Sequence, residues 1–465
     1  MSTADALERA RALARRGDDE GAKLAYVDVL RGDPTHFDAL NELGTLALAG
    51  GYRSAARTAY TQAVQHHPGN PVGRVNLANV MREDNDLAGA RRHYEAALEA
   101  DPDLPEAHQG MSAVLSELGL DGAEEHRRRG FSARPLVTRP YRGTAAAVPL
   151  LLLVSARGGN IPTQLWIDDR RFTIHALYPE YFDPNAPLPP HAVVVNAVGD
   201  ADLCALALTR AEALLAGNRA PVINAPARVR PTGRAENARR LAAIPGVIAP
   251  RIEVLPKTAL AAAAAHLEFP LLLRSLGFHT GRHFVLVTDR QDLERAAASL
   301  AGDELLAIEY LDARGEDGKA RKYRIMFIDG VAYPLHLAIS SDWKVHYFSA
   351  DMAREARFRE EEQRFLNDMP AVLGARAMQA LERIRGSLGL EYAGIDFALA
   401  PDGSVLVFEA NATMVVFPPA PDPMWDYRRP AIDTVLGAAR RMLDKYAASH
   451  GSGKGQLCIP SLSSN

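Results

Sequence analysis

The sequence predicts a multidomain protein: an all-α helical repeat, followed by an α/β fold that begins with a small parallel subdomain. The chain has 465 residues, more than one hydrophobic core ordinarily serves. Its first 134 residues repeat with a period of 34, and strand-like runs alternate with helical segments from residue 148 onward. We expect a repeat domain over 1–134, a linker over 135–147, an α/β subdomain over 148–250, a larger α/β domain over 251–448 and a disordered tail over 449–465.

Composition and charge narrow the class of protein. The 53 basic and 57 acidic residues leave a net charge of −4, which argues against an electrostatic nucleic-acid binder. Two cysteines, Cys204 and Cys458, are too few for a disulfide framework. The longest apolar stretch, Ala145 to Val154, reaches about half the length of a membrane helix. We therefore expect a cytoplasmic protein with no nucleic-acid partner and no membrane partner.

Four registers hold the period in the N-terminal part. Small residues let two helices approach closely, an aromatic side chain fills the space beside them, and a proline stops the second helix of each unit. The registers are Ala22, Ala56 and Ala90; Tyr26, Tyr60 and Tyr94; Pro34, Pro68 and Pro102; and Ala10, Gly44, Ala78 and Ser112. The polar stretch 124–129 is typical of a capping helix.

This pattern resembles the tetratricopeptide repeat from Ala4 to about Arg134. The resemblance implies a concave groove. The groove positions of this sequence lack the lysines with which some family members clamp a peptide carboxylate. Two roles stay open for it: recruitment of a protein or peptide partner, or a scaffold that extends the fold or builds a homodimer. The family's pattern places Asn41, Thr45, Val75, Asn79 and Arg82 on the groove side.

The segment after the linker is expected to form a small parallel sheet. A buried run, Leu150 to Val154, ends in a glycine turn, as strands of α/β domains do at a ligand crevice. A helix is expected over Asp202 to Leu215, with Cys204 in its core-facing side. Further strands are expected at Phe172–Leu177, Ala192–Asn196 and Val222–Asn224.

A second group of strands carries a cation and a glycine loop. The run 268–274 ends in Arg274 and is followed by a loop that contains Gly277, His279 and Gly281. Glycine amides approach anions closely, so this loop is a candidate cover for phosphates. His279 is as well explained as a cap of the turn.

The hairpin 392–411 carries oxygen donors within an apolar run. Asp396 lies on one arm, and Glu409 and Asn411 lie on the other. Residues two apart in a strand point to one face, so Glu409 and Asn411 share a face. These are hard oxygen ligands of the kind that Mg²⁺ prefers, and we predict a magnesium site here.

Taken in order, these pieces resemble the ATP-grasp fold of the glutathione synthetase and glutamate-ligase type, over about 150–448. The resemblance implies that ATP and Mg²⁺ bind and that Arg324 lies near the transferred phosphoryl group. Its other implied nucleotide contacts are Arg274, Lys322, Glu309, Tyr310 and Leu311, with Asp396, Glu409 and Asn411 as magnesium ligands.

The implied reaction is a carboxylate–amine ligation through an acyl phosphate, for which Arg274, Arg324 and Lys344 would neutralise charge. The sequence departs from the family in three places: Arg274 replaces the usual lysine, Gly394 replaces an arginine of the dipeptide ligases, and the loop 339–346 lacks the glutamate-ligase pattern. A kinase that phosphorylates a small acceptor stays open as an alternative. So does a non-enzymatic scaffold that binds nucleotide.

Two further expectations concern side chains outside this set. His336, on an apolar strand, is expected to be a core histidine that makes its hydrogen bonds internally. The run Arg354 to Arg364 mixes charges densely and is expected to be a solvated helix face.

Overall fold

The computed structural model describes residues 2–277, 283–345, 350–419 and 422–451. The chain divides into two compact units. The first comprises Met1–Ala147, Asp169–Thr173 and Tyr181–Asp183, and the second comprises Val148–Asp168, Ile174–Glu180 and Pro184–Asn465. No helix within the described ranges combines the length and apolarity that a membrane crossing requires.

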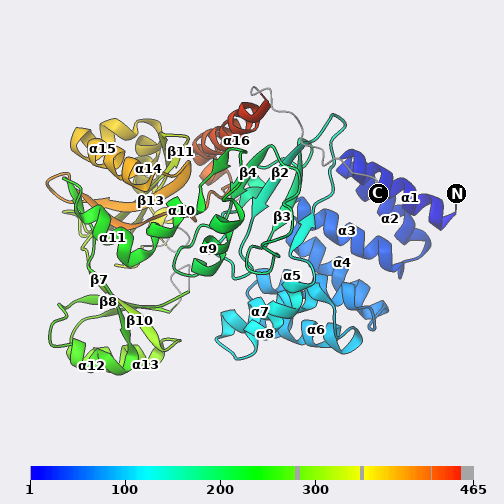
Figure 1. Ribbon diagram of the computed structural model, residues 1–465, viewed down its shortest axis with the longest axis horizontal. Coiled ribbons are helices and arrows are strands. Elements are labelled where there is room, and N and C mark those ends of the chain that lie inside the picture. Colours follow the sequence, from blue (N-terminus) through cyan, green and yellow to red (C-terminus); the bar gives the residue numbers. More distant parts are fainter. Residues whose placement is uncertain (1, 278–282, 346–349, 420–421, 452–465) are drawn as a thin grey trace, which may run out of the picture. The chain divides into compact units, whose positions relative to one another are not determined.

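The first unit is a run of helices in which each packs against the next (Figure 1). Their bounds are α1 Thr3–Arg16, α2 Asp19–Gly32, α3 Phe37–Ala49, α4 Arg53–His66, α5 Pro71–Glu83, α6 Leu87–Ala100, α7 Pro105–Leu118 and α8 Ala123–Ser132. A short strand, β1 (Leu136–Thr138), follows within the predicted linker.

The sequence registers correspond to packing contacts in this unit. Tyr60 and Tyr94 are buried, and a Cβ on Gly44 would lie 2.7 Å from the Tyr60 ring. Each register proline lies two residues beyond a helix end, as Pro68 does beyond α4. The small residue, the aromatic and the proline therefore do what their spacing predicts.

One predicted groove residue is misplaced. Val75 is 5% exposed and belongs to the apolar cluster formed by α5, α6 and α7, so it faces the core and not a groove. Asn41 accepts from the Asn76 amide at 2.7 Å, and Asn79 accepts from the Tyr94 hydroxyl at 2.5 Å. A buried apolar side chain belongs to the interface between helices and not to a solvated groove, which corrects the prediction for Val75.

The second unit begins with a sheet in which β3, β2, β4 and β5 lie side by side in that order. β2 is parallel to β4 and β4 to β5, as the alternating pattern predicts. The elements are β2 Val148–Leu153, β3 Phe172–Leu177, β4 Val193–Asn196, α9 Ala205–Leu214, β5 Val222–Ile223 and α10 Pro226–Val229.

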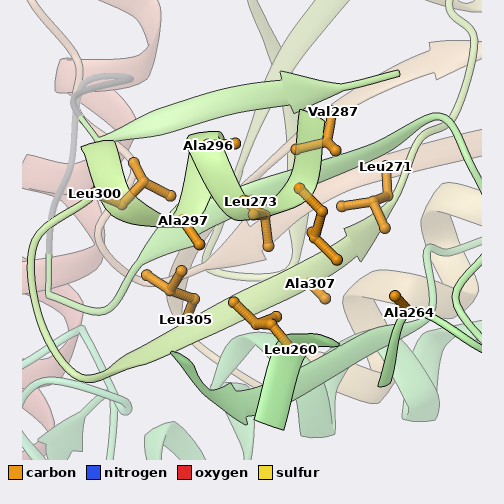
Figure 2. Packing of buried hydrophobic residues seen from close by; sticks show 11 residues of the cluster. Leu260, Ala264, Leu271, Leu273, Val287, Ala296, Ala297, Leu300, Leu305 and Ala307 are labelled. Carbon is orange, nitrogen blue, oxygen red and sulfur yellow. The ribbon is translucent and has the colours of Figure 1, made fainter. Parts of the chain in front are cut away.

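A second sheet has the antiparallel order β7-β10-β8-β9. Leu271, Leu273 and Leu305 point from its strands toward α12 and α13, and these side chains form a closed apolar cluster (Figure 2). The elements are β7 Ile252–Pro256, α12 Leu260–Ala263, β8 Leu271–Ser275, β9 Phe284–Val287, α13 Arg290–Ser299 and β10 Glu304–Glu309.

The third sheet has the order β12-β11-β13-β14-β6. Its edge strand β6 (Val247–Ile248) comes from before residue 250 and pairs in parallel with β14, so the sheet spans the predicted boundary between subdomains. The remaining elements are α11 Arg234–Ala242, β11 Ala320–Ile328, β12 Val331–Ser340, α14 Ala356–Asn367, α15 Met369–Leu388, β13 Tyr392–Leu399, β14 Val405–Asn411 and α16 Arg429–Gly451.

Two expectations for the C-terminal part need correction. The mixed-charge run is not wholly solvated, because Glu362 of α14 has no exposed surface and pairs with Arg428 at 2.5 Å. Glu362 also accepts from the Leu337 amide at 3.2 Å, so its charge is compensated from two elements. In addition, α16 continues to Gly451, past the predicted start of the tail at 449; residues 452–465 lie outside the described ranges.

Candidate functional site

A cavity of about 360 Å³ lies within the second unit, lined by strands of the second and third sheets and by α11. Gly277 is exposed and does not line it, and His279 and Gly281 lie outside the described residues. The other predicted site residues all line it: Arg274, Glu309, Tyr310, Leu311, Lys322, Arg324, Lys344, Asp396, Glu409 and Asn411.

A row of polar side chains crosses the third sheet at the floor of this cavity. Strand register places Arg324 opposite both His336 and Asp396, and Asp396 opposite Glu409. The Arg324 guanidinium donates to both Asp396 oxygens, Nε to Oδ1 at 2.5 Å and Nη2 to Oδ2 at 2.8 Å. Lys322 Nζ lies 3.1 Å from Asp396 Oδ2. The row therefore joins four neighbouring strands.

The strand pairing of the third sheet shifts register at two places beside this row. The pairing of β11 with β12 shifts after Arg324, and the pairing of β13 with β14 shifts after Asp396. A bulge re-aims side chains and bends the strand locally, and such bulges gather beside functional sites. Here the two shifts lie one residue beyond the paired Arg324 and Asp396.

Burial and charge act against each other along the row. Burial alone would raise the pKa of Asp396, but the Arg324 and Lys322 charges outweigh it and hold that pKa well below its usual range. Burial, with Arg324 nearby, lowers the pKa of His336 well below 6.5, so its ring is neutral. His336 is buried as predicted, and it also lines the cavity.

Arg234, at the start of α11, lines the cavity although it is not among the predicted site residues. Its Nη2 lies 3.0 Å from Glu409 Oε1, and its backbone amide donates to Asp202 Oδ2 at 2.9 Å. Only 12% of its side chain is exposed. The sequence carries no local signal for this role, because Glu409 is 175 residues away and an arginine at a helix start is ordinarily solvated.

The predicted metal ligands suit Mg²⁺ in chemistry, and each of the three side chains already has a protein neighbour. Asn411 Nδ2 donates to Glu409 Oε1 at 3.0 Å, while its Oδ1 accepts from the Thr413 amide at 2.9 Å. Asp396 is held by Arg324 and Lys322. Carboxylate and carboxamide oxygens fit a hard cation, although the described residues contain no group of three or more histidines, cysteines or acids placed to hold a metal ion.

Cations from two different elements approach one aromatic ring on the second sheet. Arg274 Cζ lies 5.5 Å and Lys344 Nζ 5.7 Å from the centroid of the Phe284 ring. Lys344 Nζ also donates to the Phe284 carbonyl at 3.3 Å. Burial lowers the pKa of both cations, and their mutual repulsion lowers that of Lys344 further. This pair lines the same cavity as the Arg324 row and adds positive charge to it.

β10 ends at Glu309, and the residues that follow it lead into the cavity. Glu309 Oε2 accepts from the Arg251 backbone amide at 2.9 Å, which ties β10 to the start of β7. Tyr310 and Leu311 follow directly and line the cavity, and burial raises the pKa of Tyr310. The segment thus presents backbone groups and apolar side chains together.

The comparisons with known proteins concern the repeats. A tetratricopeptide-repeat family model matches residues 47–114, so repeats of this type are present in the first unit, and such repeats generally serve protein–protein contacts. MamA from Desulfovibrio magneticus RS-1 is 21% identical, covering 28% of this chain and 74% of that chain with a TM-score of 0.26. A thermophilic repeat protein of Thermus thermophilus is 19% identical, covering 29% and 75% with a TM-score of 0.26.

A third similar structure is the first repeat domain of Spaghetti (RPAP3) bound to an HSP90 peptide. It is 16% identical, covering 25% of this chain and 92% of that chain with a TM-score of 0.24. The curated proteins contained no match to the chain.

Proposed function

We propose that the second unit is an ATP-grasp ligase, which joins a carboxylic acid to an amine at the expense of ATP. One observation supports this most. A single cavity is lined both by the Arg324–Asp396–Glu409 row and by the cations Arg274 and Lys344. Phosphoryl transfer depends on positioning and on neutralised charge more than on a protein nucleophile, and this cavity supplies both.

In the proposed reaction, a substrate carboxylate oxygen bonds to the γ-phosphorus of ATP and the bond to the β-phosphate oxygen breaks. ADP leaves, and the amine nitrogen then bonds to the acyl carbon while phosphate departs and the amine gives its proton to solvent. Arg274 and Lys344 neutralise phosphate charge from one wall, and Arg324 does so from the floor.

The other roles follow from position. Asp396, Glu409 and Asn411 would hold Mg²⁺, which neutralises nucleotide phosphates when it is bound. Asp396 orients Arg324 through two hydrogen bonds, and Arg234 holds Glu409 from α11. The segment Glu309 to Leu311 would receive the nucleobase, because it offers backbone groups beside an apolar wall.

For the first unit we propose recruitment of a protein or peptide, which would bring a substrate or a partner to the ligase. The repeat family and the exposed Thr45 support this. A homodimer through the same helices is the alternative, and sedimentation of the full chain separates the two.

Magnesium-dependent nucleotide binding provides the first test. Mg·ATP at 100 times its Kd should stabilise the wild type by about 2.7 kcal/mol, which raises Tm. The pair Glu409→Ala and Asn411→Ala should lose this gain, whereas Glu360→Ala, an exposed acid of α14 that does not line the cavity, should keep it. An unchanged Mg·ATP shift in the double variant would refute the metal assignment.

Trapping with hydroxylamine separates ligase from kinase. An acyl phosphate reacts with hydroxylamine to give a hydroxamate and phosphate, whereas a phosphorylated hydroxyl does not. ADP formation that requires an added carboxylic acid, together with formation of the hydroxamate, supports the ligase. ADP formed with a hydroxyl acceptor and without hydroxamate would establish the kinase alternative.

A further inference from the structure

The cavity has an apolar wall on each side of its charged row. Along β14 the lining runs from Val407 and Phe408, past Glu409 and Ala410, to Asn411. The β14 residues just before Val407 pair with β6, and Pro250 and Ile252 follow β6 directly and line the cavity. The wall near the end of β10, proposed above for the nucleobase, therefore lies on the Val407 side of the row.

On the other side, the chain beyond Asn411 lines the cavity with Met414, Val415 and Phe417. Leu335 of β12 and Ile432 of α16 line it as well. Among residues 413–417 the sole polar side chain is that of Thr413, whose hydroxyl donates to Asn411 at 2.9 Å. This second wall belongs to the part of the cavity that the nucleobase does not use.

At Gly394 the third sheet presents no side chain to this wall. This glycine lies opposite Asn411 in the ladder, and a Cβ there would lie 2.8 Å from both Met326 and Met414. Met414 therefore packs directly over the strand, in space that a longer side chain at 394 would occupy. A thioether adapts its shape to apolar ligands of different outline.

Phe417 extends this wall to solvent. Its side chain is 53% exposed although it lines the cavity, whereas Met414 is 4% exposed. An exposed aromatic ring at a cavity mouth is a surface that an apolar ligand removes from water. A second charge carried into this space would lose its hydration without gaining an ionic partner from residues 413–417.

We propose that the carboxylic acid substrate carries an aliphatic or aromatic group, which packs against Met414, Val415 and Phe417 while its carboxylate meets the Arg324 row. This rests on the ligase function proposed above and names the substrate class for it. Acids with a second charged group in place of the apolar one should bind more weakly, because residues 413–417 offer that charge no ionic partner.

The test uses the full chain with Mg²⁺ and a non-hydrolysable ATP analogue, and 4-phenylbutyrate and glutarate as probes. Both probes carry the reacting carboxylate, and only glutarate carries a second charge. Calorimetry should show 4-phenylbutyrate binding at least about tenfold more tightly, the discrimination that a small apolar difference produces in such a pocket. Phe417→Glu should weaken 4-phenylbutyrate about tenfold and leave the analogue's affinity unchanged.

Met424→Glu is the matched control, since Met424 is 40% exposed and does not line the cavity. It should bind both probes as the wild type does. Equal affinity for the two probes, no binding of 4-phenylbutyrate, or an equal effect of the two variants would overturn the inference. If 4-phenylbutyrate binds as expected but no acid yields ADP and hydroxamate, the apolar site stands and the ligase function is wrong.

Discussion

At the scale of single residues, two substitutions of Arg274 distinguish the effect of its charge from the effect of its guanidinium geometry. Arg274→Lys keeps the charge beside the Phe284 ring, and Arg274→Ala removes it. We expect the lysine variant to bind Mg·ATP within about tenfold of the wild type and the alanine variant to lose more, because charge near phosphate carries most of the effect. Equal losses in calorimetric affinity would show that fork geometry or packing is what the position requires.

Burial suppresses the reactivity of the Cys204 thiol. Its side chain is 1% exposed, its thiol donates to the Gly158 carbonyl at 3.2 Å, and burial raises its pKa to about 12. In a Cys458→Ala background the native protein should therefore resist alkylation by iodoacetamide at pH 8, since the thiolate is the nucleophile. One thiol should react after denaturation. Rapid alkylation of the native variant would contradict the assigned burial.

The same shift sets a pH dependence with a definite sign. The folded-state pKa lies above the unfolded value of about 8.5, so the folded protein keeps its proton where the unfolded chain loses it. This contribution to the free energy of unfolding is complete below about pH 8.5 and is lost as pH rises toward 12. Cys204→Ser in the same background should flatten that decline in urea titrations.

At the scale of elements, the helix pairs of the first unit depend on glycine where a helix crosses a tyrosine. A Cβ on Gly110 of α7 would overlap the Tyr94 ring of α6, whereas a Cβ on Gly32 of α2 would meet no atom within 4 Å. Gly110→Ala should lower the free energy of unfolding by about 1–3 kcal/mol, the usual cost of overpacking. Gly32→Ala should be neutral or raise it by up to about 1 kcal/mol.

Urea unfolding followed by far-UV circular dichroism measures both variants. Tyr94→Phe is the control, since it removes the hydroxyl that donates to Asn79 but keeps the ring. If Gly110→Ala proves as stable as Gly32→Ala, the close approach of α6 and α7 is not what requires glycine at this position.

At the scale of the whole molecule, we expect the second unit to bind nucleotide without the repeats of the first unit. Every candidate nucleotide residue lies at or beyond Arg234, so a fragment 145–450 should retain Mg·ATP binding with an affinity within about threefold of the full chain. If the repeats recruit a macromolecular substrate, their loss should raise its apparent KM and leave kcat unchanged. Loss of nucleotide binding in the fragment would make the repeats part of the site.

The companion fragment 1–134 should fold, because each helix pair packs on its neighbour. It should nevertheless be less stable than the same unit in the full chain. The Phe131 ring stacks on Tyr181 at 6.1 Å between centroids, and Arg142 pairs with Asp169 at 2.8 Å, so later segments complete this unit. Aromatic stacking contributes about 0.5–1.5 kcal/mol to the free energy of unfolding. Urea unfolding of the fragment 1–134 and of the full-length Tyr181→Ala variant, each compared with the wild-type chain, measures this loss.

What the sequence determined by itself is local and periodic. The repeat registers, the parallel strands and the hairpin follow from side-chain spacing along one segment, and the structure has each of them. Spacing also places Asp396 and Glu409 on the hairpin arms, because an antiparallel ladder brings residues near its turn into register. The predictions for Val75 and Glu362 are wrong because local pattern does not reveal which neighbour covers a helix face.

The tertiary structure alone decided which distant side chains meet. Arg324 reaches Asp396 across 72 residues and Arg234 reaches Glu409 across 175, and no local propensity encodes either pairing. The same holds for the apolar wall beyond Asn411, which draws Leu335 and Ile432 from elements far along the chain. A periodic pattern specifies how one segment folds, whereas packing between segments depends on shape and burial summed over the whole unit, and it is that packing which forms the cavity.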